Sequence, residues 1–336
     1  MNWVAVDLGT STIKASVLDK GNKPVRLSYS MGGYETTLFS SEVAVTEDGK
    51  VVIGNYGSLY GMNNPNMKVY EWLHSPNKRL IAKSIFETIK QATAEHYSDS
   101  NIGVVLLYYD VLDVELKNIA ETVFSGVKTI SVGDAIKQTI SPNSDMILIA
   151  DIGESAFRVI IQDKSECVYQ VSNKILGFSS FDMLSLIDNS DISSHGGIEI
   201  ALLGQIMQHI KILTNNGEKI ILPNNFTIKE DSLIESFTQK MSTFLYKCFE
   251  ECSNALNGIY RSWNDIDEIV FIGGGACSII LNSAFDKYMQ SHCSVKSYNS
   301  QNCEFDVLFA ASHCAIQILE LQSWKDVIVT RERNFI

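Results

Sequence analysis

Two turns of the sequence place an aspartate and a glycine directly after an apolar strand. Asp7 and Gly9 follow the apolar residues 4–6, and Asp151 and Gly153 follow the apolar residues 148–150. A glycine in such a turn lets the backbone approach a phosphate closely, so that amides and hydroxyls can bind its oxygens. An aspartate at the strand end is placed to hold Mg2+, usually through water. The two turns together predict a phosphate and magnesium site.

A third glycine-rich turn, Gly273-Gly274-Gly275-Ala276, follows a predicted strand at residues 268–272. Glycines between a strand and a helix leave room for a base or a phosphate at the helix N-terminus. The same glycines also suit a tight turn with close helix packing, and the sequence leaves both interpretations open.

The elements that position these turns form an internal repeat. Apolar patterns predict strands at residues 3–6, 13–18, 25–29, 43–45, 51–53, 102–107 and 127–130, and again at 146–151, 157–162, 167–172 and 268–272. Helical patterns cover residues 78–96, 114–123, 180–188, 198–213, 231–256 and 306–321. The repeat predicts two similar α/β domains that face each other. Ligands of such folds bind at strand carboxyl ends and between domains, so both aspartates are expected in one cleft.

The charge balance excludes some classes of partner. The chain has 27 Lys and Arg against 39 Asp and Glu, a formal net charge of −12, and its longest basic run is Lys78-Arg79. Nucleic acids and anionic membranes bind basic patches. We therefore expect neither nucleic acid nor a membrane as a partner.

The cysteines and the N-terminus predict a soluble cytoplasmic protein. None of the 7 cysteines forms a CxxC pair, and Cys248 and Cys252, four apart in a predicted helix, have no second ligand pair. This favours helix packing over a metal site. Free cysteines are typical of reducing compartments. The N-terminus opens into a strand pattern, and the longest apolar run, residues 104–109, is too short for a membrane span.

In this order, the three turns resemble the first phosphate loop, the second phosphate loop and the adenosine loop of the actin and heat-shock-chaperone ATPase superfamily. Stretches between them resemble the nucleotide-binding domain of DnaK-type heat-shock chaperones. The similar segments are residues 41–49 with 52–54, residues 64–66, 176–182, 265–274 and 315–317, which resemble that family's PSVVAFTEDG…VG, NPEN, LGGEDFD, DIDEVILVGG and AAIQA. The resemblance covers nearly the whole chain.

The resemblance implies the actin-like ATPase fold, two ribonuclease-H-like α/β domains with a nucleotide cleft between them. Domain I is expected at residues 1–140, with a C-terminal helix at about 304–325 packing back onto it. Domain II is expected at residues 141–303 with a reduced outer subdomain, and residues 324–336 as a linker-like tail. The implied cofactors are ATP or ADP and Mg2+, with Asp7 and Asp151 as the metal-binding residues.

The implied nucleotide contacts come from the three turns, one strand and one helix. They are Gly9, Thr10, Ser11, Thr12, Lys14, Gly153, Ser155, Lys211, Gly273, Gly274, Gly275 and Ala276. Lys211 is all that remains of the chaperones' ERAKR segment, and Cys277 stands where an arginine stacks on adenine in that family. These losses imply weakened or altered nucleotide recognition.

The catalytic groups also depart from the chaperone pattern. The chaperones' catalytic lysine follows the NPEN segment, but residues 72–74 hold no lysine. Lys14 stands where actin and plasmid-partition actin homologues carry a phosphate-contacting lysine, which could supply positive charge to the β- and γ-phosphates. The alternative for Lys14 is an ordinary solvated strand lysine.

The second phosphate loop and a nearby acidic residue depart further. Residues 151–156 lack two glycines and the final threonine of the chaperones' DLGGGT, which positions the attacking water, and Glu154 adds a negative charge. Ser155 could substitute as the hydroxyl. The chaperones' NEPTAAA segment aligns loosely with residues 132–136, whose carboxylate Asp134 could equally be a helix N-cap residue. The implied catalytic set is Asp7, Lys14, Asp134 and Asp151.

The sequence thus predicts an ATP-binding, slowly ATP-hydrolysing, chaperone-like protein of the DnaK type without a peptide-binding domain. Residues 324–329 resemble the linker to that domain, and the chain stops at Ile336. The expected partners are nucleotide and a protein client or co-chaperone. Two alternatives stay open: a self-assembling, actin-like filament ATPase, favoured by Lys14 and the third turn, and a pseudo-ATPase scaffold, favoured by the second turn.

Overall fold

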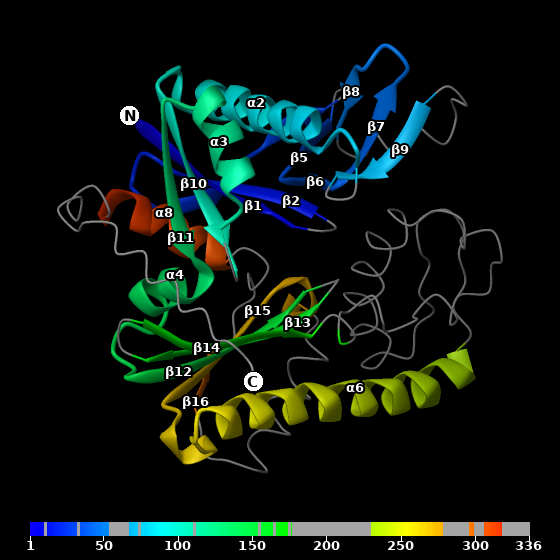
Figure 1. The fold of residues 1–336 in the computed structure, drawn as a ribbon, viewed down its shortest axis with the longest axis vertical. Coiled ribbons are helices and arrows are strands. Elements are labelled where there is room, and N and C mark those ends of the chain that lie inside the picture. The colour runs from blue at the N-terminus through cyan, green and yellow to red at the C-terminus, as the bar shows by residue number, and fades with distance from the viewer. Residues whose placement is uncertain are drawn as a thin grey trace, which may run out of the picture.

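The computed structural model describes residues 1–9, 12–31, 34–53, 67–72, 75–109, 112–153, 156–163, 166–173, 176, 230–277, 296–298 and 306–317. Within these ranges the chain is a mixed α/β protein with two larger sheets, two smaller ones and α-helices around them (Figure 1). The α/β class predicted from the sequence is confirmed at this level.

The first large sheet contains the strands predicted at residues 3–6 and 13–18, which pair as a hairpin. Its strand order is β3 (Pro24–Arg26), β2 (Thr12–Leu18), β1 (Asn2–Leu8), β10 (Ile102–Tyr108) and β11 (Gly126–Ser131), and β6 (Leu38–Ser40) also pairs with β2. The pairs β3–β2 and β2–β1 are antiparallel, whereas the pairs β1–β10 and β10–β11 are parallel. The carboxyl ends of β1 and β10 therefore lie at the same edge of the sheet, where Asp7 stands.

The second large sheet repeats this arrangement. Its order is β14 (Glu166–Asn173), β13 (Phe157–Asp163), β12 (Met146–Ile152), β15 (Glu268–Ile272) and β16 (Lys296–Tyr298). The pairs β14–β13 and β13–β12 are antiparallel, and β12–β15 and β15–β16 are parallel. The two large sheets thus share one strand order and one set of strand directions.

Some elements have no counterpart in the sequence patterns. β9 (Met67–Glu71) was not predicted, and it pairs with β7 (Glu42–Thr46), which also pairs with β8 (Val51–Val52). β7 and β8 themselves correspond to the strands predicted at residues 43–45 and 51–53. β4 (Tyr29–Met31) and β5 (Tyr34–Thr36) form a separate hairpin. The predicted helices at residues 180–188 and 198–213, and residues 318–321 of the last predicted helix, lie outside the described residues.

One face of the first sheet is covered by α2 (Lys78–Tyr97) and α3 (Val114–Val123), both close to their predicted ranges. Ile81, Ile85 and Ile89 recur every four residues along α2, which places them on one side of the helix. They pack with Val4 and Val6 of β1 in one buried core. Burial of this apolar stripe fixes α2 against the sheet.

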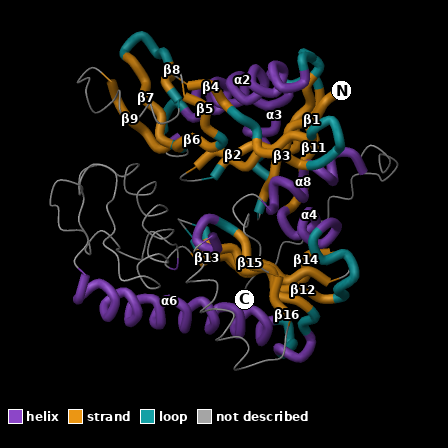
Figure 2. Tube along the Cα trace, turned by 180° about the vertical axis from the view of Figure 1, so that it is seen from behind, coloured by secondary structure: helices purple, strands orange, loops and turns teal. Residues whose placement is uncertain are grey.

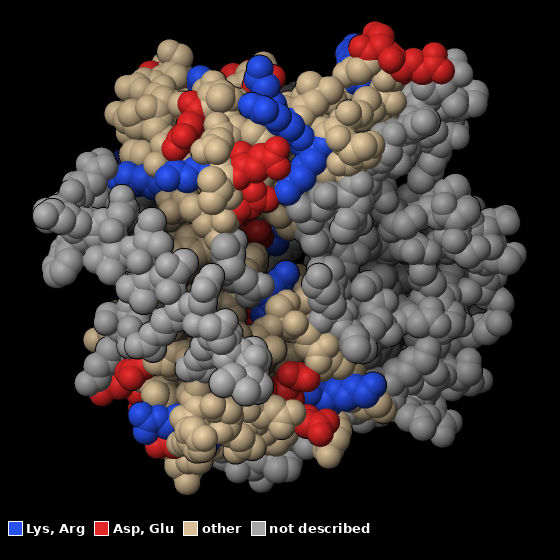
Figure 3. Space-filling view, viewed as in Figure 1, with Lys and Arg blue, Asp and Glu red and all other residues tan. Residues whose placement is uncertain are grey.

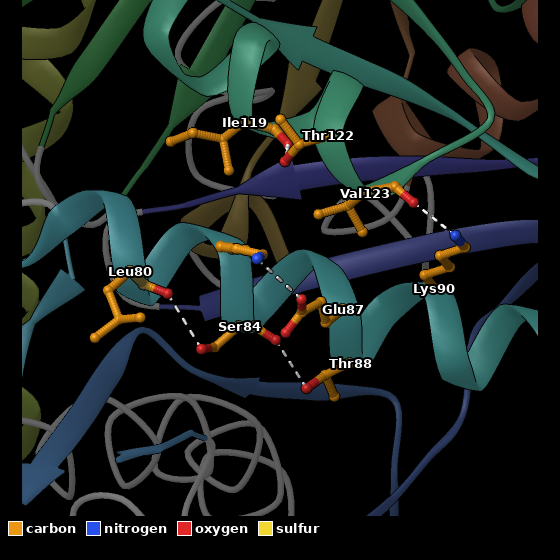
Figure 4. A network of polar contacts seen from close by, with 9 residues as sticks. Leu80, Ser84, Glu87, Thr88, Lys90, Ile119, Thr122 and Val123 are labelled. Atoms are coloured by element: carbon orange, nitrogen blue, oxygen red, sulfur yellow. Dashed lines mark hydrogen bonds and ion pairs between the residues drawn. The ribbon is translucent and has the colours of Figure 1, made fainter. Parts of the chain in front are cut away.

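Polar contacts along α2 connect it to α3 (Figure 4). The Lys90 ammonium donates a hydrogen bond to the Val123 carbonyl oxygen at the end of α3, at 2.6 Å. On another turn of α2, Ser84 and Thr88 donate their hydroxyl protons to the carbonyl oxygens of Leu80 and Ser84, at 3.1 and 3.0 Å. The Ser84 and Thr88 hydroxyl groups thus find hydrogen-bond acceptors within α2 itself, while Lys90 joins α2 to α3.

Two helices lie between the large sheets, α4 (Val132–Thr139) and α8 (Asp306–Gln317), as Figures 1 and 2 show from opposite sides. Val132 and Ile136 of α4 and Val307 of α8 share a core with strands β12, β13 and β15 of the second sheet. Other α8 residues, among them Ala310 and Cys314, pack with β1 and β10 of the first sheet. The two helices therefore join the two sheets through apolar contacts.

The second sheet is covered on its other face by the long helix α6 (Glu230–Gly258), which contacts β13 and β14 (Figure 2). Cys248 and Cys252 of α6 are fully buried, and both are free cysteines. Burial raises the pKa of both thiols. Helix packing is the role that this position supports for the pair.

Candidate functional site

The first hairpin places Asp7 opposite Lys14. These residues face each other in the register of β1 and β2, and the Lys14 Nζ lies 3.4 Å from the Asp7 Oδ2. Both side chains are buried. A buried charge needs a partner, and the two side chains form an ion pair with each other. The alternative of a solvated strand lysine is therefore wrong for Lys14.

The second hairpin repeats this pair with a different cation. Asp151 of β12 faces Arg158 of β13 in register, and the Arg158 Nη1 donates a hydrogen bond to the Asp151 Oδ2 at 2.8 Å. In both hairpins the cation follows the aspartate by seven positions. Sequence reasoning missed Arg158, although the seven-residue spacing of Asp7 and Lys14 was a signal that could have found it.

Glycines keep both turns tight. A Cβ atom on Gly9 would lie 2.5 Å from the Thr12 carbonyl oxygen, and one on Gly153 would lie 2.9 Å from the Ala156 carbonyl oxygen. The two glycines thus have equivalent steric surroundings, two residues after each aspartate. The first turn is also held from outside, because the buried Trp72 donates its indole proton to the Gly9 carbonyl oxygen at 3.2 Å.

Tyr109 lies where the two hairpins meet. It follows β10 directly, and its ring lies 4.3 Å from the guanidinium carbon of Arg158. Burial raises the pKa of Tyr109 well above its usual value, and the charges of Asp7 and Asp151 raise it further. The pKa of this one tyrosine is therefore raised by both carboxylates, one from each sheet. We call Asp7, Lys14, Asp151 and Arg158 the charge cluster.

The charge of Asp7 also acts on Asp151. Burial raises the pKa of Asp151, Arg158 acts in the opposite direction, and the charge of Asp7 raises that pKa again. Burial works against the charged form of Arg158, but the charge and hydrogen bond of Asp151, together with the charges of Tyr109 and Asp7, raise the arginine pKa. In Figure 3, acidic and basic side chains are visible in a hollow between the upper and lower halves of the molecule.

The third turn lies against the second aspartate. β15 runs parallel to β12, and Ile272 at its end is the register partner of Asp151. Gly273 follows with a φ of 91°, and a Cβ atom there would lie 2.3 Å from the Asp151 Oδ1. Only glycine combines this backbone conformation with so close an approach. The short 3-10 helix η8 (Gly274–Cys277) then begins, and the Ala276 amide donates to the Gly273 carbonyl oxygen.

Asp134 has a structural role at the start of α4. The Ser131 hydroxyl caps this helix by accepting from the Asp134 amide at 3.0 Å, and it donates to the Asp134 Oδ2 at 2.6 Å. The other oxygen, Oδ1, accepts from the Gln162 side-chain amide at 3.1 Å. Asp134 is therefore part of the N-terminal capping arrangement of α4, with Ser131 as the N-cap residue, and it ties α4 to β13.

The expected contact residues belong only in part to the described ranges of the chain. Thr10, Ser11, Ser155 and Lys211 lie outside the described residues. Thr12 opens β2, where it pairs with Ser40 of β6. Of the three turns, the described residues thus bring together the two aspartates, Lys14, the flanking glycines and Gly273.

The described side chains around Asp151 do not fit a hydrated Mg2+ ion. Among the described residues, no group of three or more His, Cys, Asp and Glu side chains is placed to hold a metal. Asp151 is 1% exposed, Arg158 occupies its Oδ2, and the Gly273 backbone closes in on its Oδ1. Because Mg2+ keeps several of its waters, it needs space beside the carboxylate that this arrangement does not leave.

Comparisons of the sequence with known proteins identify no relative of this chain. No protein-family model and no curated protein matches the chain. Among the described helices, none is long and apolar enough to cross a membrane.

Proposed function

We propose that this chain is a nucleotide-binding protein of the actin and heat-shock-chaperone type, whose two ribonuclease-H-like halves close on ATP or ADP. The observation that carries the proposal is the charge cluster, in which two aspartate turns from two sheets meet at Tyr109. In α/β folds, such convergence at strand carboxyl ends marks a ligand site. Lys14 and Arg158 are the groups suited to bind phosphate oxygens.

The shared order of the two large sheets supports two ribonuclease-H-like halves. Each sheet has three antiparallel strands followed by two parallel ones, and each first hairpin carries the aspartate. A repeated unit with its site at the interface suits a ligand that contacts both halves at once. A nucleotide, with phosphates at one end and a base at the other, is such a ligand.

The proposed output is a change in conformation. α4 and α8 lie between the sheets, and apolar side chains such as Ile136 and Val307 pack in the same core as the second sheet. A movement of one sheet relative to the other would have to repack these side chains. A ligand that contacts both hairpins binds best when the two sheets are in one particular relative position, and it therefore stabilises that conformation. A protein client or co-chaperone is the partner expected to respond to that movement.

Slow hydrolysis fits the site better than rapid turnover. Both carboxylate oxygens of Asp134 accept hydrogen bonds from Ser131 and Gln162, so Asp134 is committed to structure rather than to activating water. The Mg2+ implied by the resemblance is not part of the proposal, since the surroundings of Asp151 do not fit it. We therefore expect ATP hydrolysis to be slow, and binding to be the principal activity.

Thermal unfolding with nucleotides tests the proposal. ATP and ADP at about 100 times their dissociation constants should stabilise the protein by about 2.7 kcal/mol, which raises Tm. Lys14→Met should lose much of this shift, whereas Lys83→Met, on the exposed side of α2, should keep it. Absence of any shift with ATP, ADP or GTP would overturn the proposed function.

An actin-like filament protein is the second candidate. It is favoured by Lys14, which stands where the plasmid-partition actin homologues carry a phosphate-contacting lysine and which faces Asp7 across the first hairpin. Sedimentation separates the two candidates, because a filament former pellets when ATP is added and a chaperone-like monomer stays in the supernatant.

A further inference from the structure

We propose that Arg158 takes the place of a divalent cation in the charge cluster, so that the cluster binds the phosphates of its nucleotide without a metal ion on Asp151. This inference rests on the proposed function for the identity of the ligand. One part of the inference, that Arg158 excludes a metal from Asp151, concerns this chain alone and is testable without nucleotide.

The first observation is the unequal exposure of the pair. The Arg158 side chain is 18% exposed, whereas that of Asp151 is 2% exposed. In the first hairpin the difference is small and has the opposite sign, with Lys14 at 9% and Asp7 at 12%. In the second hairpin an approaching ligand or ion therefore meets the guanidinium group, and the carboxylate lies behind it.

The second observation is that the guanidinium is held in place from several sides. Its Nη1 donates to Asp151, and its central carbon lies over the Tyr109 ring. A Cβ atom on Gly153 would lie 3.1 Å from the same Nη1, so the turn itself borders the group. A planar cation that is bonded on one edge and stacked on one face is preorganised, and it loses little freedom when it binds an anion.

The third observation is the charge balance. Asp7 and Asp151 are each paired with a cation of the chain, at 3.4 and 2.8 Å. A divalent ion on Asp151 would have to displace the guanidinium or remain beside it, and like charges at such distances repel each other strongly in a buried site. Arginine also has five N–H donors in a fork that matches phosphate oxygens, and the bond to Asp151 uses one of them. The guanidinium can therefore do for the phosphates what the metal does elsewhere.

Manganese titration followed by electron paramagnetic resonance tests whether Arg158 excludes a metal from Asp151. Mn2+ serves as the probe because it prefers the same oxygen ligands as Mg2+. Wild-type protein should leave the signal of free Mn2+ unchanged, Arg158→Gln should bind about one ion, and the double variant Arg158→Gln, Asp151→Asn should bind none. A wild-type site that Asp151→Asn abolishes would overturn the inference, and so would a folded Arg158→Gln variant that gains no site.

The second measurement is the nucleotide affinity of the wild-type protein. It does not need the Arg158→Gln variant, so it tests the inference even if that variant fails to fold. The dissociation constants of ATP and ADP, measured by calorimetry, should be equal with Mg2+ and with EDTA. An affinity about tenfold or more higher with Mg2+ would overturn the inference and leave the proposed function standing. Absence of binding in both buffers would overturn the proposed function, and the manganese titration would still decide the role of Arg158.

An arginine elsewhere on the surface provides the matched control. Arg79→Gln removes the same group from an exposed position on α2, away from the charge cluster. It should match wild type in the manganese titration and in both nucleotide buffers. A manganese site gained equally in Arg79→Gln would show that the effect does not come from Asp151, and it would overturn the inference.

Discussion

The β1–β2 and β12–β13 hairpins place an aspartate and a cation at equivalent positions, and they differ in how closely the two groups are joined. Lys14 and Asp7 lie 3.4 Å apart with similar exposure, whereas Arg158 and Asp151 are joined by a 2.8 Å hydrogen bond that leaves the carboxylate fully covered. Lysine is a flexible point charge, and arginine is a rigid fork. The same backbone device therefore gives an adaptable pair in the first half and a fixed pair in the second.

Removing the cation should cost more in the second hairpin. Arg158→Met leaves the buried Asp151 carboxylate unpaired, and we expect a loss of about 3 to 5 kcal/mol in the free energy of unfolding. Lys14→Met removes a longer contact, and we expect about 2 kcal/mol. Urea denaturation of both variants measures the difference.

A neutral pair controls for the loss of packing. In the double variant Asp151→Asn, Arg158→Gln no charge is left alone, so it should regain most of the stability lost in Arg158→Gln. Equal losses for Lys14→Met and Arg158→Met would show that the two hairpins are energetically alike, contrary to their geometry.

The third turn contacts the second hairpin at Asp151 and Ile152, so its glycines sharpen the comparison. Gly273→Ala brings a Cβ atom to 2.3 Å from the Asp151 Oδ1 at a φ of 91°, and we expect a cost of about 3 kcal/mol from strain and overlap. Gly274→Ala is the matched control, because a Cβ atom there meets nothing within 4 Å. Thermal unfolding should separate the two variants clearly, and similar melting temperatures would contradict the close contact with Asp151.

Two helix starts extend the comparison to pH, with a smaller effect. Asp113 caps α3 by accepting from the Leu116 amide and also bonds Lys78, while the neutral hydroxyl of Ser131 caps α4. Burial alone would raise the pKa of Asp113, but Lys78 and the α3 amides lower it below 3.8. Alanine at either cap should cost about 1 kcal/mol at neutral pH.

The two caps should respond differently to acid. The contribution of a carboxylate with a lowered pKa is complete above 3.8 and is lost as the pH falls through the folded-state value. The cost of Asp113→Ala should therefore shrink in acid, while that of Ser131→Ala should persist. Urea denaturation across this pH range checks the difference, and an Asp113→Ala cost that does not change with pH would contradict the role of the ionised cap.

Much of the secondary structure could be predicted from the sequence because its patterns are local. Apolar runs bounded by Asp-x-Gly turns identified both hairpins, and the helical periods placed α2 and α3 within a residue or two of their ends. α4 was missed because eight residues are too few to show a helical period. β9 was missed because β7, the strand with which it pairs, is separated from it by residues 47–66, and pairing is not visible in the pattern of one strand.

The candidate site was predicted in part for the same reason. Asp7, Asp151 and the glycines near them follow from strand endings and turn chemistry, which short segments encode. Of the two roles that the sequence left open for Asp134, the structure shows the one in helix capping, and its bonds to Ser131 and Gln162 depend on where α4 meets β13. Tyr109 could not be recognised as a site residue from the sequence, since no local pattern around it predicts its contact with Arg158.

The sequence by itself determined the two aspartate turns and the repeat that carries them, since strand periodicity and glycine conformation act over a few residues. Only the tertiary structure decided which cation each aspartate meets, how deeply each pair is buried, and that Gly273 closes on Asp151. These properties depend on strand register and on the contact of one sheet with another. The pairing energy of a charge is set by the distance to its partner and by the exclusion of water, and both exist only after the chain has folded.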